Sequence, residues 1–421
     1  MFFIYRIIIN LILLISPIII FIRLLKKKEN PNRFKEKFCI FTKKRKAGKL
    51  IWFHGASVGE VLSIIPLVEK LEKDKDINQI LITSNTLSSS KILSNLNLKK
   101  VTHQFFPIDT TYHTKKFLDY WNPQLVIFID SEIWPNMITS IKNRSTPLML
   151  LNARITKKSF KKWKLFNLIS KSFFEKFDIC LSSSLSSSKY LKLLGAKKIK
   201  NIGNLKFSQT EQNKDLLNLD LKNFFLSKKI WCAASTHATE EKFCGLTHKK
   251  LKLKYKNLLT IIIPRHIDRS KSIINEMKKL NLKVHTHESI NKINDNTDIY
   301  LVDTYGRTKS FFKICKVVFL GGSMINHGGQ NPLEAARFGC KIIHGENIWN
   351  FEEIYKLLDT NNISQKVENV NQMTNKIDKI LKNKTNSKNI KSKIKNLGDK
   401  ILNLTLKEVN FLLSKNETKK T

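Results

Sequence analysis

The chain has 421 residues, of which 42% are hydrophobic and 10% aromatic, so it is long enough for two domains with cores of their own. Its 14 glycines and 9 prolines exclude a fibrous or largely disordered protein. The 75 Lys and Arg outnumber the 34 Asp and Glu, which gives a net charge of +41. This balance predicts a polyanionic partner, either nucleic acid or an anionic lipid surface, unless much of the lysine only solvates the surface.

The N-terminal segment is apolar from residue 2 to residue 22. It is followed by Arg23 and by lysines at positions 26, 27 and 28. Its length is about that of a membrane-spanning helix. A secretory signal peptide is the alternative, but no small-residue cleavage site follows. We therefore expect a single anchor at residues 1–28, either spanning the bilayer or lying in its surface. The basic cluster predicts that the following domains are cytosolic.

Short apolar runs alternate with helix-spaced segments, which predicts βαβ units and mainly parallel sheets. In the first half, the predicted strands are residues 50–53, 79–83, 125–129, 147–151 and 178–181. In the second half, they are residues 230–234, 258–263, 282–285, 299–302, 317–320 and 340–343. A polar stretch at 203–215 separates the series and predicts two Rossmann-like halves. Residues 382–393 are predicted to be loop or frayed helix, and apolar residues between 390 and 404 predict a packed final helix.

The six cysteines lie at positions 39, 180, 232, 244, 315 and 340, and none forms a C-x-x-C pair. Their spacing excludes a zinc ribbon or a dense disulfide framework and fits a reducing compartment. We expect all six to be small buried side chains.

The first candidate site is the segment HGASVGE at residues 54–60, where a predicted strand meets a helix. Ser57 and Glu60 have the spacing of a helix capping box, so Glu60 has two interpretations, a cap or a catalytic carboxylate. Gly55 and Gly59 favour a catalytic site, because glycine lets a substrate approach the backbone closely.

Carboxylates also follow the strand at 125–129, in the segment DSEIWPN. Glu132 and Asn136 are expected either to hold the loop backbone or to face a cleft, because a charge at a buried strand end needs a partner. Arg154 follows the next strand, where it could pair with Glu132 or with a substrate anion.

In the second half, Ser235, Thr236 and His237 follow one strand, and Arg265 follows the next. Hydroxyls and cations beside helix N-termini suit a phosphate or carboxylate ligand, although a lone strand-end arginine is often only a surface ion-pair partner.

Four of the glycines fall at positions 321, 322, 328 and 329, immediately before the sequence QNPLE. Glycine-rich turns before a helix can offer backbone N–H groups to a phosphate, and Glu334 could accept bonds from ribose hydroxyls. The pattern is neither G-x-G-x-x-G nor a Walker A loop, which disfavours dinucleotide dehydrogenases and P-loop NTPases.

Taken in order, these segments resemble the Kdo (3-deoxy-D-manno-octulosonic acid) transferase family. The resemblance covers residues 50–355 and rests on the segments WFHGASVGEV, FFPIDT, SEIWPN, LLNARIT, GNLKF, AASTHATEE, IIPRH, VDTYG, FLGGS and GGQNPLEAA. It implies a GT-B fold, in which two Rossmann-like domains face a cleft, the first binding the acceptor and the second the nucleotide sugar. It further implies transfer of Kdo from CMP-Kdo to the tetraacylated lipid A precursor, with inversion and without a metal or cofactor.

By matching position, the resemblance makes Glu60 the catalytic base and Arg265 a ligand of the donor's phosphate or carboxylate. The other residues placed on the donor side are Gly322, Ser323, Asn331, Glu334, Ser235, Thr236 and His237. Those placed on the acceptor side, or in a structural role, are Ser57, Gly59, Glu132, Asn136 and Arg154. The chain departs from the family pattern at Gln330, Ala335, Arg307 with Thr308, and residues 130–132, where the family usually has His, Pro, Glu-Leu and Glu-Thr-Glu.

The expected organisation is an anchor at 1–28, an acceptor domain at 29–207, a nucleotide-sugar domain at 208–385, and a helix with a basic tail at 386–421. The expected location is the cytoplasmic face of the bacterial inner membrane, with CMP-Kdo, the lipid A precursor and the anionic membrane surface as partners and no nucleic acid. The alternatives are a GT-B glycosyltransferase or epimerase using another nucleotide sugar, a basic nucleic-acid-binding protein, and a non-catalytic membrane scaffold. Binding of CMP rather than UDP would argue against a GT-B enzyme that uses another nucleotide sugar. Salt-sensitive binding to polynucleotides would indicate a nucleic-acid-binding protein. A non-catalytic scaffold would tolerate the loss of Glu60.

Overall fold

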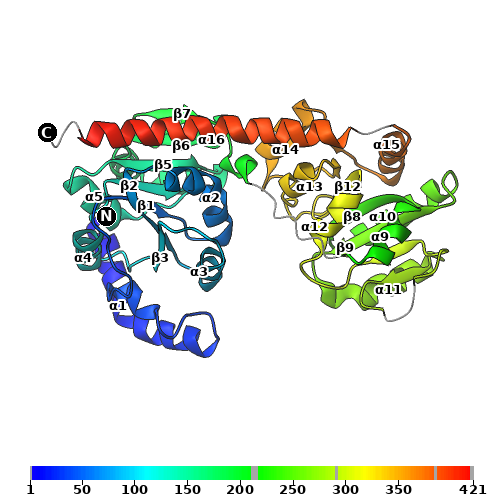
Figure 1. Cartoon of the computed structure of the whole chain (residues 1–421), viewed down its shortest axis with the longest axis horizontal. Coiled ribbons are helices and arrows are strands. Elements are labelled where there is room, and N and C mark those ends of the chain that lie inside the picture. Colours follow the sequence, from blue (N-terminus) through cyan, green and yellow to red (C-terminus); the bar gives the residue numbers. More distant parts are fainter. Residues whose placement is uncertain (1, 210–216, 290–292, 384–385, 418–421) are drawn as a thin grey trace. The chain divides into compact units, whose positions relative to one another are not determined.

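The computed structural model describes residues 2–209, 217–289, 293–383 and 386–417 (Figure 1). The chain divides into two compact units: unit 1 is Met1–Thr210 with Leu397–Thr421, and unit 2 is Glu211–Asn396. The polar stretch expected at 203–215 ends near this division, and its residues 210–215 lie outside the described part of the chain.

Unit 1 is built on a sheet of seven strands in the order β3-β2-β1-β4-β5-β6-β7. All neighbouring strands are parallel, and Trp52 of β1 is aligned with Leu81 of β2 and Val126 of β4. The strands are β1 (Lys49–His54), β2 (Ile77–Ser84), β3 (Val101–Phe105), β4 (Leu125–Ile129), β5 (Leu148–Ala153), β6 (Ile179–Ser182) and β7 (Ile199–Asn201).

The helices of unit 1 begin mostly at side chains that cap them. Hydroxyl groups accept a bond from the backbone N–H three residues later, which satisfies a donor that the helix leaves unpaired. These N-cap residues are Ser57, Thr86, Thr110, Thr156 and Ser184. The helices are α1 (Phe2–Leu25), η1 (Phe34–Phe38), α2 (Val58–Glu72), α3 (Leu87–Ser94), α4 (Thr111–Trp121), α5 (Pro135–Asn143), α6 (Lys157–Leu165), α7 (Asn167–Phe174), α8 (Leu185–Leu193) and η2 (Leu205–Ser208).

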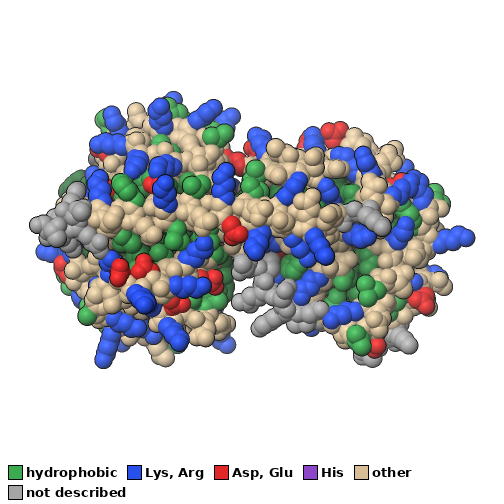
Figure 2. Space-filling view, turned by 45° about the horizontal axis from the view of Figure 1, so that its top comes forward, with side chains coloured by type: hydrophobic (Ala, Val, Ile, Leu, Met, Phe, Trp, Pro, Cys, Tyr) green, Lys and Arg blue, Asp and Glu red, His purple; other side chains and the backbone are tan. Residues whose placement is uncertain are grey.

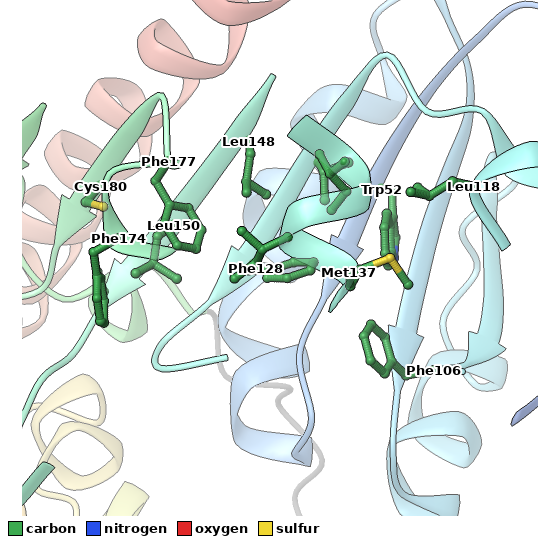
Figure 3. Close-up of a cluster of buried hydrophobic side chains, with 14 of the residues drawn as sticks. Trp52, Phe106, Leu118, Phe128, Met137, Leu148, Leu150, Phe174, Phe177 and Cys180 are labelled. Atoms are coloured by element: carbon green, nitrogen blue, oxygen red, sulfur yellow. The ribbon is translucent and has the colours of Figure 1, made fainter. Parts of the chain in front are cut away.

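The core of unit 1 fills the space between the sheet and its helices (Figure 3). Trp52 and Trp121 are fully buried, and each indole N–H finds a partner: Thr83 Oγ1 at 2.9 Å and Gln104 Oε1 at 3.0 Å. A buried indole N–H without an acceptor costs free energy, so these two bonds help to fix the sheet and α4 in one arrangement.

Unit 2 repeats this plan with the strand order β10-β11-β9-β8-β12-β13-β14, again all parallel. Its strands are β8 (Lys229–Thr236), β9 (Leu258–Pro264), β10 (Val284–Thr286), β11 (Ile299–Leu301), β12 (Val317–Leu320), β13 (Lys341–His344) and β14 (Ser364–Lys366). Its helices are α9 (Leu219–Leu226), α10 (Glu240–Lys252), η3 (Ile267–Arg269), α11 (Ser270–Lys279), α12 (Thr308–Ile314), α13 (Leu333–Arg337), α14 (Glu352–Thr360) and α15 (Val370–Lys382). The last helix, α16 (Ser387–Glu417), starts in unit 2 and ends in unit 1.

The predicted fold class is confirmed, because every predicted strand is present and both sheets alternate with helices. Three further strands, β3, β7 and β14, escaped the apolar pattern, and each lies at an edge of its sheet. The expectation of loop or frayed helix at 382–393 is wrong from residue 387 onwards, where α16 begins. The packed final helix is confirmed, since Ile390, Ile394 and Ile401 are buried.

Two surface features bear on the charge and the N-terminus. Figure 2 shows Lys and Arg side chains scattered over the visible face of both units, a distribution typical of lysine that solvates a surface. Within the described ranges, α1 is the one helix long and apolar enough to cross a membrane.

All six cysteines are buried and unpaired, as predicted.

Candidate active site

The candidate residues gather where the strand order reverses within each sheet. In unit 1, β2 and β3 follow β1 on one side, while β4 lies on the other side of β1. In unit 2, β9 and β12 flank β8 in the same way. Ligands of open parallel sheets bind at the carboxyl ends of strands at such a reversal. The turns after β1 and β4, and those after β8 and β12, are therefore the places to look for chemistry.

Glu60 lies in the first turn of α2, folded back over the end of β1. Its Oε2 accepts the backbone N–H of Ala56 at 2.7 Å, and its Oε1 accepts the hydroxyl of Ser57 at 2.8 Å. The Ser57 hydroxyl in turn accepts the Glu60 N–H at 3.4 Å. A side chain at Gly55 would meet the Glu60 side chain, since an added Cβ would lie 3.1 Å from Glu60 Cβ. The capping geometry predicted for Ser57 and Glu60 is thus present.

The same carboxylate is also suited to proton transfer. Burial raises the pKa of Glu60, and the neighbouring charges of Asp130 and Glu132 raise it further, against the bonds from Ser57 and Ala56. Each carboxylate oxygen has a second lone pair, so Glu60 can accept one more hydrogen bond while it holds its present partners. A half-buried carboxylate with a raised pKa is what a general base near neutral pH requires. Gly59, next to it, is exposed, and no atom lies within 4 Å of where its Cβ would be.

His54 and Glu132 form a buried pair beside Glu60. His54 Nε2 lies 3.2 Å from Glu132 Oε2, which also accepts the indole N–H of Trp134 at 2.8 Å. The other ring nitrogen of His54 is 2.9 Å from Thr83 Oγ1. Burial lowers the pKa of His54, so the ring is neutral and donates one N–H to the carboxylate. Burial works to raise the pKa of Glu132, but the bonds from His54 and Trp134 outweigh it and hold the pKa below its ordinary value.

The turn after β4 and the last part of β5 each hold a residue in the left-handed backbone conformation. Asp130 has φ of 56° and Asn152 has φ of 54°, which is uncommon for residues other than glycine. Asn152 bonds to the Asp130 carboxylate through its amide N–H and accepts the Leu205 N–H at 2.9 Å. Arg154 donates its backbone N–H to Asp130 O at 3.1 Å and contributes positive charge near the Asp130 carboxylate. This interaction of Arg154 with Asp130 was not among the pairings predicted from the sequence.

Asn136 has a structural part in unit 1. Its side-chain N–H bonds to Asp109 O at 2.5 Å, and its backbone N–H bonds to Asp109 Oδ2 at 3.0 Å. Asp109 also accepts the Met137 N–H at 2.8 Å, so this carboxylate caps the start of α5. Burial raises the pKa of Asp109 to about 6.

In unit 2, Glu240 clamps the glycine-rich loop that follows β12. Its two oxygens accept four backbone N–H groups, from His237 at 2.9 Å, Gly322 at 2.7 Å, Ser323 at 3.1 Å and Met324 at 3.0 Å. Glu240 is only 1% exposed. Because this carboxylate already takes the N–H groups of Gly322 and Ser323, the loop does not offer them to a phosphate, as the sequence analysis expected of a glycine-rich turn. The Glu240 carboxylate instead fixes the backbone of this loop.

Three side chains converge on the space that Gly322 leaves. A Cβ built there would lie 3.0 Å from the ring of His327, 3.4 Å from Gln330 Nε2 and 3.4 Å from the ring of His237. The rings of His237 and His327 are 4.3 Å apart, centroid to centroid. His237 Nε2 is buried and has no hydrogen-bond partner among the described residues. The pKa of His237 is lowered to about 4, by burial first and then by the charges of the surrounding histidines and arginines. The ring is therefore neutral near pH 7, and one of its nitrogens is left without a partner among the described residues.

The hydroxyl residues of this region differ in what they can offer. Thr236 Oγ1 is buried and has no partner in the described part of the chain, whereas Ser323 Oγ donates to Leu320 O at 2.5 Å and accepts the Gly345 N–H at 2.9 Å. Ser323 thus braces the loop. Ser235 has φ of 55°, and its carbonyl oxygen would lie 2.3 Å from a Cβ at Gly321, so β8 and the loop approach each other at the backbone.

The remaining donor-side residues lie at the surface of unit 2. Arg265 donates its backbone N–H to Thr236 O at 3.0 Å, and its side chain is exposed. Asn331 Oδ1 caps the N–H of Leu333 at 3.1 Å, and Glu334 is 3.5 Å from Lys309 Nζ. The structure therefore brings Arg265 to the same strand end as Thr236 and His237, and gives Asn331 a role in starting α13.

Sequence reasoning missed two residues of unit 2. They are Glu240 and His327, neither of which was given a role. An acid in the first turn of a helix signals capping, but nothing in its spacing shows that it caps a loop 82 to 84 residues away. In the part of the chain that the structure describes, no group of His, Cys, Asp and Glu side chains is arranged to hold a metal ion.

Comparison with known proteins first defines the class. The structure is similar to UDP-GlcNAc 2-epimerase from Neisseria meningitidis, with a TM-score of 0.58 and 12% sequence identity, covering 87% of this chain and 100% of that one. At this identity the likeness concerns the fold alone, and it places the chain in the GT-B-like class of two-unit α/β folds.

The sequence comparisons then give the family. Residues 32–209 match the family described as 3-deoxy-D-manno-octulosonic-acid transferase (kdotransferase). The chain is 39% identical to the 3-deoxy-D-manno-octulosonic acid transferase of Rickettsia bellii over 82% of both chains. It is 31% identical to that of Haemophilus influenzae over 73% of both chains. The chain belongs to the 3-deoxy-D-manno-octulosonic acid transferase family, and it is a glycosyltransferase. The predicted family is confirmed.

Proposed function

We propose that this enzyme moves Kdo from CMP-Kdo to the tetraacylated lipid A precursor, with inversion at the anomeric carbon, in lipopolysaccharide biosynthesis. The observation that carries the proposal is Glu60, a carboxylate with a raised pKa held at the strand reversal of unit 1 by Ala56 and Ser57. Family membership supplies the transferred sugar, and the family resemblance supplies the donor and the acceptor.

Glu60 acts as the general base. It takes the proton of the acceptor hydroxyl as that oxygen forms a bond to the anomeric carbon of Kdo. On the opposite face of the sugar, the bond from this carbon to the phosphate oxygen breaks, its electron pair stays on the phosphate, and CMP leaves. The proton ends on Glu60, whose raised pKa favours the protonated form. His54 and Glu132 are positioning residues: their bond links the end of β1 to the segment after β4, beside Glu60.

Unit 2 holds the donor. The exposed guanidinium of Arg265 suits the phosphate or the sugar carboxylate, since arginine binds both through paired N–H donors. His237, with an unpartnered buried nitrogen, and the neighbouring His327 line the space next to Gly322. Glu240 accepts the backbone N–H of Gly322, and Ser323 accepts that of Gly345, so both residues hold the glycine-rich loop in place. Glu334, in the first turn of α13, is the residue proposed for the ribose.

The membrane and the lipid acceptor form the remaining part of the proposal. The apolar helix α1 attaches the enzyme to the bacterial inner membrane, and both units face the cytoplasm. An anionic membrane surface and a doubly phosphorylated lipid suit the net charge of +41. No metal ion, cofactor or nucleic acid takes part in the proposed reaction, because the acid–base and anion-binding groups named above perform each step.

A transfer assay on the purified enzyme tests the proposal. We expect product from CMP-Kdo and the tetraacyl lipid A precursor, and its near-complete loss in Glu60→Gln with the fold retained. Glu69→Gln, the same substitution at an exposed position of the same helix, is the matched control and should fold normally and keep its activity. Transfer from a UDP-sugar in place of CMP-Kdo would contradict the proposed donor. Full activity of Glu60→Gln would contradict the role of Glu60 as the general base.

A further inference from the structure

Helix α1 has one side covered by protein along its whole length. The covered or half-covered positions recur every three or four residues, which is the repeat of one face of a helix. They are Phe2, Tyr5, Arg6, Ile9, Leu13, Ser16, Ile20, Arg23 and Leu24. The exposed large apolar side chains lie between them, at Phe3, Ile4, Ile7, Ile8, Leu11, Ile12, Leu14, Ile15, Ile18, Ile19, Phe21, Ile22 and Leu25. A helix that crossed the bilayer away from the globular units would have no such covered stripe.

The N-terminal end of α1 is attached to the body of unit 1. The hydroxyl of Tyr5 donates to Asp109 Oδ2 at 2.7 Å, and Arg6 Nε donates to Asn136 Oδ1 at 3.1 Å. Asp109 and Asn136 are each 1% exposed, so both bonds reach into the interior of the unit. These are the residues that cap and begin α5, next to the turn that carries Glu132.

The C-terminal end of α1 is tied to the same loop of unit 1. Arg23 Nε and Lys37 Nζ both bond to Glu29 Oε1, at 2.6 and 2.5 Å. Lys37 O then accepts the N–H of Ile108 at 3.0 Å, one residue before Asp109. Figure 1 shows the chain turning back at the far end of α1 and returning towards the sheet of unit 1.

These contacts are incompatible with a spanning helix. The 18 steps from Tyr5 to Arg23 cover about 27 Å along a helix axis, close to the thickness of the hydrocarbon core. If α1 crossed the membrane, Tyr5 would lie on the opposite side from Arg23 and could not reach Asp109. Both ends can contact unit 1 only when the helix runs parallel to the surface of that unit.

A second segment, next to the N-terminal end of α1, has the composition of a membrane contact. The ring of Phe173 in α7 lies 5.4 Å from that of Phe2, edge to face. The connection from α6 to α7 exposes Leu165 by 78%, Phe166 by 48% and Leu168 by 86%. Helix α6 carries no acidic residue, and its exposed lysines are Lys157, Lys158, Lys161, Lys162 and Lys164. Lysines are attracted to an anionic bilayer surface, and exposed apolar side chains beside them insert into the interface.

We propose that α1 lies in the near leaflet alongside unit 1, with the N-terminus on the same side of the membrane as both units. The α6–α7 connection contacts the same anionic bilayer surface. The covered stripe of α1 faces the protein, and its exposed apolar side faces the acyl chains. The inference rests on the proposed membrane attachment of α1, but it does not depend on the donor, the acceptor or the catalytic base.

Protease protection in cells tests the position of the N-terminus. The full chain is made with one epitope tag on a short linker at the N-terminus and a different tag at the C-terminus, which serves as the matched control. We expect both tags to be protected in spheroplasts and both to be removed in inverted membrane vesicles. Removal of the N-terminal tag alone in spheroplasts would show a spanning helix and overturn the inference. Recovery of the protein outside the membrane fraction would overturn the attachment itself, whatever the transfer assay shows.

A fluorescent label tests the α6–α7 connection. Leu168→Cys and the control Leu226→Cys, which is 77% exposed in α9 of unit 2, are each labelled with an environment-sensitive dye. The native cysteines are all buried, so the dye attaches to the introduced thiol. With vesicles containing phosphatidylglycerol, we expect a blue shift of the dye at position 168 and none at position 226. Shifts at both positions, or at neither, would contradict this contact.

Discussion

The helices that follow β1 and β8 each carry a glutamate in their first turn, and the two glutamates are bonded in different ways. Glu60 accepts one backbone N–H and one hydroxyl, and it remains half-exposed. Glu240 accepts four backbone N–H groups and is 1% exposed. Burial raises the pKa of both carboxylates. The position of a carboxylate at a strand reversal therefore does not indicate its role. The number of hydrogen-bond donors already bonded to the carboxylate is the better indicator.

The same substitution at both positions gives the largest contrast. In Glu60→Gln the amide cannot take the proton of the acceptor, so we expect kcat to fall by about 100- to 10,000-fold, the usual contribution of a general base. The free energy of unfolding should change by less than about 1 kcal/mol, because an amide at a half-exposed cap keeps part of its bonding. Transfer assays and denaturant unfolding measure the two quantities.

Ser57→Ala sharpens this test. It removes a cap and one bond to Glu60 but leaves the carboxylate, so it should cost about 1 kcal/mol of stability and much less activity than Glu60→Gln. If both variants lost activity equally, the carboxylate of Glu60 would be a cap and not the base.

Glu240→Gln should give the reverse result. Glutamine has one accepting oxygen, so its amide nitrogen faces two of the four backbone N–H groups, and buried donors without acceptors are costly. We expect a loss of about 3 kcal/mol in the free energy of unfolding, measured by urea denaturation. Affinity for CMP should fall with it, because the loop that Glu240 holds lines the proposed donor site. An unchanged free energy of unfolding would mean that the four bonds to Glu240 are not needed to hold the loop.

Gly322→Ala probes the space beside that clamp. The residue has φ of 66°, and the added methyl group would lie 3.0 Å from the ring of His327. We expect a loss of about 1 to 2 kcal/mol of stability, from the left-handed backbone and the crowding together. CMP binding, measured by calorimetry, should weaken as well. Gly306→Ala, which also has positive φ but no atom within 4 Å of the new methyl group, separates the backbone cost from the crowding.

The smallest expected effect is the titration of His237. Its pKa is lowered to about 4, by burial first and then by His327, His266 and two arginines. Because the unfolded chain binds a proton below pH 6.5 and the folded ring does not until about pH 4, this group lowers stability as the pH falls through that window. NMR of the ring should show the titration near pH 4, and His327→Gln should move it upward. A titration near pH 6.5 in the folded protein would contradict the buried environment.

The apolar pattern was sufficient to predict the central strands of both sheets, because parallel strands covered on both faces read as continuous apolar runs. It failed at β3, β7 and β14, whose sequences VTHQF, IKN and SQK are polar or short. Strands at a sheet edge have fewer neighbours to pack against, so their composition carries less information. The first turn of α16 escaped for a similar reason, since its lysines and asparagines face solvent.

For the site, the sequence predicted the cap formed by Ser57 and Glu60, because both residues lie within one turn of a helix. It did not predict that Glu240 would take the N–H groups of residues 322–324, which lie in another βα unit. It also did not predict that His237 and His327 would meet over Gly322. Contacts between distant segments depend on strand order and crossing geometry, and a single sequence does not contain that information in its local pattern.

Helix α16 has a consequence for synthesis on the ribosome. Its last part belongs to unit 1, where Gly398 is so close to Phe207 that an added Cβ would lie 2.5 Å from Phe207 O, and Val409 and Leu412 are buried. At 5 to 20 residues per second, the roughly 200 residues made after Thr210 take on the order of 10 to 40 s. Throughout that time the nascent first unit lacks the helix that covers it. Its apolar surface stays exposed to chaperones until α16 has been made.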